Sequence, residues 1–462
     1  MAYPALLVTI LFILWLLRRD VRRRPGLSRA LWVPTFFLLI LGSRPLPMWL
    51  AGGGYNGPRS SNNPIDQLFY AGVYGFGLVV ASKRGMNWGK VLVGNWPLLL
   101  LYVYFICGAS WSDEPLGSLV RILKDFSMIF VVAQIYSEKE PFQAMRAVFI
   151  RSACVLYPLS VTFNRWFPSF SREYNPNGGM MLSGVTGQKN SLGEILFLLC
   201  LFIFWDHLEN YELNSRKKFL KSMPWDHMLL IGMSILLLVQ SQSKTALICL
   251  SLGAAFIYRR GILSKRMASI VAYGAVLSTP FLLFFSREFA DVIQPIVAAL
   301  GRDMTFTGRT NIWDQITWET VNPWIGCGYW NFWQGPKGKA ISDAIKWAIP
   351  TAHCGYLDVY LDGGILGVAA LLLVLVAYGW KLIKDGQARY RVVGLAVLST
   401  SIIYNLSESN FLRISPLWFG TVLMMVAFPL KKRFARTVSV GQEVSPTYLR
   451  GIHQDAECVP TR

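Results

Sequence analysis

Charged residues are scarce in this chain of 462 residues. Asp, Glu, Lys and Arg together make up 15% of it, whereas soluble domains usually carry about 25%. Hydrophobic residues reach 53%, and the mean hydropathy is +0.39. One soluble core cannot hide that much apolar surface. The composition therefore excludes an ordinary soluble domain and indicates a protein that is solvated by lipid.

Acidic residues are the scarcer of the charged types, with 26 Asp and Glu against 45 Lys and Arg, which gives a net charge of +19. In a soluble protein this excess would suggest a nucleic-acid partner. Here the basic residues lie between long hydrophobic runs, where a positive-inside bias accounts for them. Nucleic acid is therefore not expected as a partner.

Metal ligands and cofactor motifs are also few. The chain has seven cysteines and four histidines, and no pair of cysteines has the spacing of metal ligands. No nucleotide-binding loop is visible either, so we expect neither a metal nor another cofactor. Cys327 and Cys354 alone fall in the large outer loop described below. These two cysteines could form a disulfide, because that compartment is oxidising. The alternative is that they are two free thiols too far apart to bridge.

The N-terminus lacks the basic region that opens a secretory signal. Its first apolar run, 3–17, is instead followed by five arginines within 18–24. Such a cluster holds its own side of the membrane in the cytoplasm, so we expect the N-terminus outside.

The hydrophobic runs predict an all-α polytopic membrane protein with about 13 spans, twelve plus an extra one at the N-terminus. The predicted spans are 3–17, 29–43, 66–82, 91–108, 118–136, 147–163, 191–206, 228–242, 245–258, 267–285, 364–380, 392–405 and 415–430. Basic residues gather in every second loop, at 18–24, 83–90, 139–146, 216–221, 259–266, 381–391 and 431–436. This alternation predicts a membrane domain over 1–436 and a cytoplasmic C-terminus. The polar tail 437–462 is expected to be disordered.

The longest outer segment, 286–363, lies between predicted spans 10 and 11. Two amphipathic helices are expected in it, one over 309–321 that ends at Pro323, and one that carries Ile341 to Ala348 and ends at Pro350. Helices of this kind suggest a lid that lies on the bilayer over a membrane-level cavity. The alternative is a small packed cap with no active role.

His353 is the one histidine that this topology places outside. The preceding Pro350-Thr351 pair is typical of a helix start with Thr351 as N-cap. A neutral imidazole beside a lid can serve as a general base. The alternative is an interfacial histidine that is bonded to backbone.

Four cations also fall on the outer side, against the positive-inside trend: Lys189, Lys244, Arg302 and Arg309. An anionic ligand such as a diphosphate would account for them, because Arg grips phosphate oxygens bidentately and Lys acts as a point charge. Snorkelling to lipid phosphates is the alternative.

Three further polar residues are candidates for supporting roles. Arg121 lies inside the fifth predicted span and should face a wet cavity, or pair with the nearby Asp125. Glu408 and Asn410 follow the twelfth span on the outer side. They could orient the histidine or bind an acceptor hydroxyl, or they could merely cap the helix end.

Six segments in this order resemble the O-antigen ligase and polymerase superfamily of bacterial membrane proteins, above all its exopolysaccharide polymerisation branch. They are Trp-Ser-Asp-Glu-Pro at 111–115, Gly-Val-Thr-Gly-Gln-Lys-Asn at 184–190, Ser-Lys-Thr-Ala at 243–246, Gly-Arg-Thr-Asn-Ile-Trp at 308–313, Pro-Trp-Ile-Gly-Cys-Gly at 323–328 and His-Cys-Gly-Tyr-Leu-Asp at 353–358. The resemblance covers about 95–430. Two positions depart from the family pattern, because members often have Arg at Lys244 and His at Gln188.

The resemblance implies a metal-independent glycosyltransferase of the bacterial inner membrane. Such enzymes move a glycan from a polyprenyl diphosphate carrier to a hydroxyl of a glycan or lipid acceptor on the outer face. The family's outer-loop histidine corresponds to His353, its loop arginine to Arg309, and its basic residue after the Ser-X-Ser turn to Lys244. Membrane lipids, and polysaccharide export and chain-length proteins, are the other partners it implies. The acceptor, and the choice between polymerase and ligase, stay open.

Two other classes of protein compete with this interpretation. A secondary transporter of a small anionic solute would also have many spans and intramembrane charges, although no repeated pattern of broken helices is visible. A structural or scaffold membrane protein is the third reading.

Overall fold

The structure is a computed structural model that describes residues 2–51, 63–174, 178–210, 223–258, 274, 312–313, 315–316, 320–345, 349–385 and 388–426. Several predictions lie wholly or mostly outside these residues: Arg302, Arg309, the tenth span at 267–285, the helix over 309–321 and the tail 437–462.

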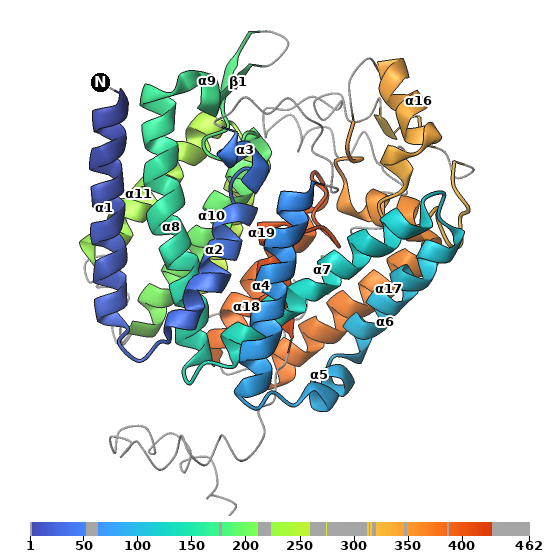
Figure 1. Cartoon of the computed structure of the whole chain (residues 1–462), viewed down its shortest axis with the longest axis horizontal. Helices are drawn as coiled ribbons and strands as arrows, with labels where there is room; N and C mark the ends of the chain where they lie inside the picture. Colours follow the sequence, from blue (N-terminus) through green and yellow to red (C-terminus); the bar gives the residue numbers. More distant parts are fainter. Residues whose placement is uncertain are drawn as a thin grey trace, which may run out of the picture.

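The described chain is almost entirely helical (Figure 1). Its elements are α1 (Ala2–Arg23), η1 (Arg29–Leu31), α2 (Trp32–Leu41), α3 (Leu46–Leu50), α4 (Pro64–Lys83), α5 (Trp88–Gly94), α6 (Trp96–Cys107), η2 (Gly108–Trp111), α7 (Pro115–Tyr136), α8 (Pro141–Trp166), α9 (Pro168–Ser171), β1 (Arg172–Tyr174), β2 (Met180–Leu182), α10 (Lys189–Asn210), α11 (Trp225–Ser241), α12 (Lys244–Tyr258), η4 (Phe332–Gln334), α16 (Pro336–Ile345), α17 (Gly355–Asp385), α18 (Ala388–Tyr404) and α19 (Pro416–Met425). The two strands pair antiparallel, with Glu173 opposite Met181.

Four described helices, α4, α8, α10 and α17, are long and apolar enough to cross a membrane. The helices α5 and α6 would be a fifth span, but they meet at 88°, so the predicted span 91–108 is not one straight helix. The bend falls at Asn95, whose amide nitrogen donates to the Val91 carbonyl and whose oxygen accepts the Tyr378 hydroxyl. Pro97 follows it and cannot donate a helical hydrogen bond. Shorter apolar helices occupy 29–41, 390–404, α11, α12 and α19. The chain is a polytopic membrane protein.

The centre of the bundle is formed by α8 and α10. Of the residues in their most apolar stretches, 83% and 89% are buried inside the protein, against 22% for α4. Peripheral helices turn large apolar side chains outward instead, including Leu7 and Leu11 of α1, Leu68 of α4 and Val239 of α11. An apolar periphery around a packed interior is what a lipid solvent requires.

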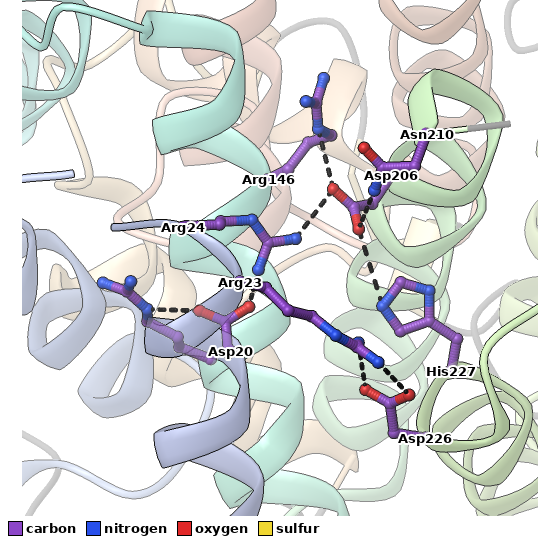
Figure 2. Close-up of polar contacts among 9 residues, drawn as sticks. Asp20, Arg23, Arg24, Arg146, Asp206, Asn210, Asp226 and His227 are labelled. Carbon is purple, nitrogen blue, oxygen red and sulfur yellow. Dashed lines mark hydrogen bonds and ion pairs between the residues drawn. The ribbon is translucent and has the colours of Figure 1, made fainter. Parts of the chain in front are cut away.

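Arginine–aspartate pairs fasten α1 to the central helices at one end of the bundle (Figure 2). Asp206 of α10 accepts from Arg24 and Arg146 over 2.8 and 3.0 Å. Asp20 of α1 pairs with Arg24 and accepts from Arg151 of α8 over 2.8 Å. Such buried charges are tolerated because each carboxylate has at least two cationic partners.

A second contact of this kind fastens α1 to α11. Arg23 grips Asp226 with two hydrogen bonds of 2.6 and 3.1 Å (Figure 2). His227 approaches Asp206 to 3.6 Å from the same turn. The first helix, which the sequence marks as an extra span, is thus an integral part of the bundle.

A break in α17 shapes the other end of the molecule. At Gly364 the backbone has φ 61° and ψ −162°, which interrupts the helix. A conformation of this kind is almost exclusive to glycine. The break frees carbonyl groups before it and N–H groups after it, and these must be satisfied within the protein.

The motif at 323–328 satisfies them. Pro323 and Trp324 accept the N–H groups of Ile365 and Leu366 over 2.8 and 3.1 Å. Cys327 and Gly328 donate their own N–H groups to the carbonyls of Leu361 and Asp362 over 3.0 and 2.9 Å. A Cβ atom on Gly326 would lie 2.5 Å from the Asp362 backbone, so only glycine permits this approach. The 323–328 motif therefore braces α17 at its break through backbone hydrogen bonds and fixes the first half of the helix.

Candidate functional site

His353 lies in the loop that leads into α17. Its backbone is left-handed, with φ 52°, and the helix begins two residues later at Gly355. The prediction that Thr351 is an N-cap with the histidine in the first helical turn is therefore wrong, because a left-handed residue cannot continue a right-handed helix. Thr351 Oγ1 instead accepts the N–H of His353 itself over 3.4 Å.

The loop is held in place by Asp358, one turn inside α17. Its Oδ1 accepts the N–H of Ala352 over 3.0 Å and the indole N–H of Trp333 over 2.8 Å. The Ala352 carbonyl in turn accepts the indole N–H of Trp313 over 2.9 Å. The N–H and the carbonyl of Ala352 are thereby both bonded, which fixes the strained residue that follows it.

The His353 imidazole faces a carboxylate. Its Nδ1 lies 3.6 Å from Oε2 of Glu408, and the two side chains are only 13% and 11% exposed. The other carboxylate oxygen, Oε1, accepts the amide of Asn190 over 2.7 Å. Tyr404 fixes Asn190 in turn by donating to its carbonyl over 2.7 Å. Tyr404, Asn190 and Glu408 thus form one hydrogen-bonded line, and the imidazole lies 3.6 Å beyond its carboxylate end.

The loop over 405–415 carries Glu408 and packs on the start of α17. Its conformation is set by Asn405, whose Oδ1 accepts the N–H groups of Asn410 and Phe411 over 2.8 and 2.9 Å. The N–H of Gly355 donates to the carbonyls of Asn405 and Glu408. A Cβ on Gly355 would lie 2.1 Å from Asn405 Oδ1, so glycine is required where the two segments meet.

Two helix N-termini converge on the same place. Lys189 is the first residue of α10, next to Asn190, and Lys244 is the first residue of α12. Thr245 shares a 2.8 Å hydrogen bond with Ser407, beside Glu408. A Cβ on Gly193 of α10 would come 2.7 Å from the hydroxyl oxygen of Ser243, which shows how closely the two helix starts pack. Helix N-termini with adjacent lysines favour bound anions.

Lys189 also has contacts within the protein. Its Nζ lies 2.9 Å from the sulfur of Met181, and its N–H donates to Glu173 over 3.2 Å. The β1–β2 hairpin is thereby drawn to the start of α10 (Figure 1). The residues that follow the two lysines, Asn190 and Thr245, contact Glu408 and Ser407, so the two helix starts border the loop that faces His353.

Asn410 and Arg121 are not brought to the imidazole by their described contacts. The Asn410 amide nitrogen faces both oxygens of Glu194 at 3.1 Å and the Ser415 hydroxyl at 2.9 Å. Arg121 Nη1 donates to Gln334 over 2.9 Å, and the segment that carries Gln334 meets the 405–415 loop at Leu412, through the Tyr329 hydroxyl. The expected partner of Arg121, Asp125, instead accepts the Tyr102 hydroxyl over 2.7 Å.

Arg44 is a neighbour of the site that sequence reasoning missed. Its guanidinium donates to the Phe170 carbonyl and lies 3.6 Å from the centre of the Phe170 ring. A Cβ on Gly187 would meet its Nε at 3.0 Å, so Arg44 lies against the 184–190 motif. The sequence could have indicated it, because Arg44 follows the predicted span 29–43 and is another cation that the predicted topology places outside.

Cys327 and Cys354 are not joined in a disulfide. Cys354 is fully buried, and Cys327 directs its sulfur to the Leu361 carbonyl at 3.2 Å. Burial raises the pKa of the Cys327 thiol, which makes it a poor nucleophile. Among the described residues, no group of three His, Cys, Asp or Glu side chains could hold a metal ion.

Comparison with known proteins agrees with the motifs. Residues 228–372 match the O-antigen ligase family. Over 331 residues the chain is 25% identical to the exopolysaccharide production protein ExoQ of Rhizobium meliloti (strain 1021), covering 68% of this chain and 70% of that protein. The resemblance predicted from the motifs is confirmed. The matched family region contains Lys244 and His353, whereas Asn190 and Glu408 lie outside it.

Proposed function

We propose that this polytopic protein with an O-antigen ligase domain is a glycosyltransferase that polymerises or ligates polysaccharide units. It moves a glycan from a polyprenyl diphosphate carrier to a hydroxyl of the acceptor. The observation that carries the proposal is the arrangement of His353, Glu408 and Asn190 beside the lysine-bearing starts of α10 and α12.

The chemistry needs a base and a place for negative charge. The acceptor oxygen attacks the anomeric carbon of the donor sugar, and its proton passes to the His353 imidazole. The bond from that carbon to the phosphate oxygen breaks, and the diphosphate leaves with its lipid. Glu408, 3.6 Å from Nδ1, orients the ring and stabilises the imidazolium that forms.

The departing diphosphate is matched by cations. Lys189 and Lys244 supply charge at two helix N-termini, and the dipoles of both helices add to it. Arg302 and Arg309, outside the described residues, complete the set in this proposal. A diphosphate is already a good leaving group, so stabilising its charge and accepting one proton are sufficient work for the protein.

The proposed setting is the bacterial inner membrane with about 13 spans, the N-terminus outside and the C-terminus in the cytoplasm. The Asp206 network then lies at the cytoplasmic edge, because Asp206 follows Lys189 by 17 residues of α10, about 25 Å. Positive-inside bias supports this orientation, since Arg19, Arg23 and Arg24 lie at that edge. Chain-length and export proteins are proposed partners.

The test is the product formed by purified protein in lipid nanodiscs. It is given a lipid-linked oligosaccharide and, separately, a glycan or lipid acceptor. We expect the oligosaccharide to appear on the acceptor with release of the polyprenyl diphosphate. A transporter of small anions would instead leave the donor intact and accumulate a labelled solute in proteoliposomes. Uptake without transfer would refute the proposal.

A further inference from the structure

A second cationic group lies near the other end of the 405–415 loop. His353 faces that loop at Glu408, whereas Tyr329, which is bonded to Ser118 of α7, donates to it at Leu412. Arg121 of α7 is only 4% exposed, and of its three guanidinium nitrogens only Nη1 has a hydrogen-bond partner, Gln334. Within the described part of the chain, Nε and Nη2 are buried without any acceptor. A buried donor without a partner is costly, and two on one side chain require an explanation.

The two unpartnered nitrogens belong to the same edge of the guanidinium. The Nε–H and Nη2–H bonds run parallel along that edge, and together they form the fork that takes a carboxylate or phosphate bidentately. The nearest carboxylate, Glu114, reaches only Nη1, at 3.7 Å, and is itself 57% exposed. The edge best suited to a planar oxyanion is thus the edge that the protein leaves unfilled.

The other buried arginine nearby has its anion already. Arg413 donates to Asp362 over 2.8 Å. Burial alone would lower the pKa of the Arg413 guanidinium, yet Asp362 more than offsets this and the pKa is raised. Asp362 is bonded to Arg413 and acts on Arg121 only through its charge, so among the described residues no carboxylate lies within hydrogen-bond distance of Arg121.

The surroundings of Arg121 suit a sugar. Segment 329–334 lies along α7, because Ser118 donates to the Tyr329 carbonyl over 3.0 Å and Arg121 donates to Gln334. Between these anchors Trp330 is half-buried and has a left-handed backbone, with φ 48°, which is rare for a bulky residue and typical of functional sites. The Arg413 guanidinium lies 4.6 Å from the Trp330 ring centre. The partly exposed indole is thus an aromatic group between these anchors, and a sugar ring can stack on the part of it that Arg413 does not cover.

The start of α7 is the exposed part of the chain that lies next to Arg121 in sequence. Asp113, Glu114 and Leu116 are exposed. Gly117 packs directly against the guanidinium, because a Cβ there would lie 3.3 and 3.4 Å from Nη1 and Nη2. A side chain at this position would therefore crowd Arg121. In this structure Nε and Nη2 are buried, so a ligand reaches them only once the neighbouring side chains of the 113–117 segment move aside.

We propose that the Nε–Nη2 edge of Arg121 binds an oxyanion of the substrate, namely a carboxylate carried by a sugar of the glycan, with Trp330 beside it. This inference rests on the proposed glycosyl transfer. The carrier diphosphate is the other source of an oxyanion, but in the proposed mechanism it lies with Lys189 and Lys244, whose helix starts contact the loop at Ser407 and Glu408 and not at Leu412. Arg121 is then a determinant of glycan specificity.

The experiment compares two donors in nanodiscs. One is a lipid-linked oligosaccharide with a single sugar carboxylate, and the other is the same compound with that carboxyl reduced to an alcohol. For the parent enzyme we expect a KM at least tenfold lower for the acidic donor. Arg121→Gln should raise the KM for the acidic donor at least tenfold and leave the reduced donor unchanged, and Arg121→Lys should fall between because the fork is lost. Lys124→Gln, on the same helix against the Tyr70 ring, is the matched control and should change neither.

Each contrary result has a distinct meaning. Equal KM values for the two donors in the parent enzyme would overturn the inference. So would an Arg121→Gln variant that loses competition by glycan-free polyprenyl diphosphate, since the oxyanion would then be the carrier phosphate. If no donor is turned over, the proposed function fails by itself. The inference is then tested by calorimetry, which measures binding of the free acidic oligosaccharide to the parent and to an Arg121→Lys variant with an unchanged unfolding temperature. Tight binding that the variant loses supports the site. Equal binding by both proteins overturns it.

Discussion

Replacing Glu408 by Gln should slow glycan transfer without unfolding the protein. The change removes a negative charge 3.6 Å from Nδ1 of His353 and keeps the shape of the side chain. Its effect should appear when the imidazole accepts the acceptor proton and becomes positive. The backbone carbonyl of Glu408, which accepts the Gly355 N–H, is untouched.

The magnitude follows from the geometry. Two unit charges separated by 3.6 Å interact by about 5 kcal/mol at an effective dielectric constant of about 20. Solvent reaches both side chains, so we expect about 2 kcal/mol to survive screening, which is a fall in turnover of about 30-fold. Glu408→Asp keeps the charge at a greater distance and should lose less.

The assay is single-turnover transfer from a labelled lipid-linked donor, with the unfolding temperature measured in parallel. Glu140→Gln makes the same chemical change at an exposed carboxylate before α8 and should have no effect. Near-normal turnover by the Glu408→Gln variant, with its unfolding temperature unchanged, would refute the idea that the carboxylate assists the histidine.

Three further predictions concern the frame around the site. Gly364→Ala should destabilise the protein by about 3 kcal/mol, because a Cβ there would lie 2.3 Å from the Trp324 carbonyl carbon; an unchanged unfolding temperature would contradict the account of the α17 break. Asp206→Asn should cost about 3–5 kcal/mol in unfolding free energy, because Arg146 loses its paired carboxylate and Arg24 keeps only Asp20; a cost below about 1 kcal/mol would show that the network is hydrated. Tags at the two ends should react from opposite sides of sealed right-side-out cells, and labelling of neither end from outside would remove the first predicted span.

The sequence predicted helices well where they are apolar throughout. The long hydrophobic runs of α8, α10 and α17 are unambiguous, since lipid-embedded backbone must bond within its own helix. The interruptions were not predicted. The 88° bend at Asn95 and the break at Gly364 depend on partners far along the chain, Tyr378 and the 323–328 motif, which no local pattern reveals.

For the candidate site, residue type carried more information than local structure. Lys189 and Lys244 stand out as cations on the side that disfavours them, and each is followed by a residue that contacts the loop of Glu408, the carboxylate facing His353. Their shared role with His353 stays a prediction. The helix start at Thr351 was predicted wrongly, because the left-handed backbone of His353 is imposed by bonds from Asp358 and Trp313 to its neighbour Ala352. Asn410 was paired in sequence with Glu408, yet it faces Glu194, a tertiary contact.

The central claim is that His353 takes the proton of the acceptor hydroxyl. The most direct measurement is single-turnover transfer by His353→Ala, with donor binding and unfolding temperature measured on the same nanodisc samples. The imidazole is 13% exposed and its described side-chain contact is with Glu408, so folding and donor binding should be nearly unchanged. Turnover should fall by about 10²–10⁴, the usual contribution of a positioned acid–base group. Transfer at a near-normal rate by the alanine variant would contradict the account.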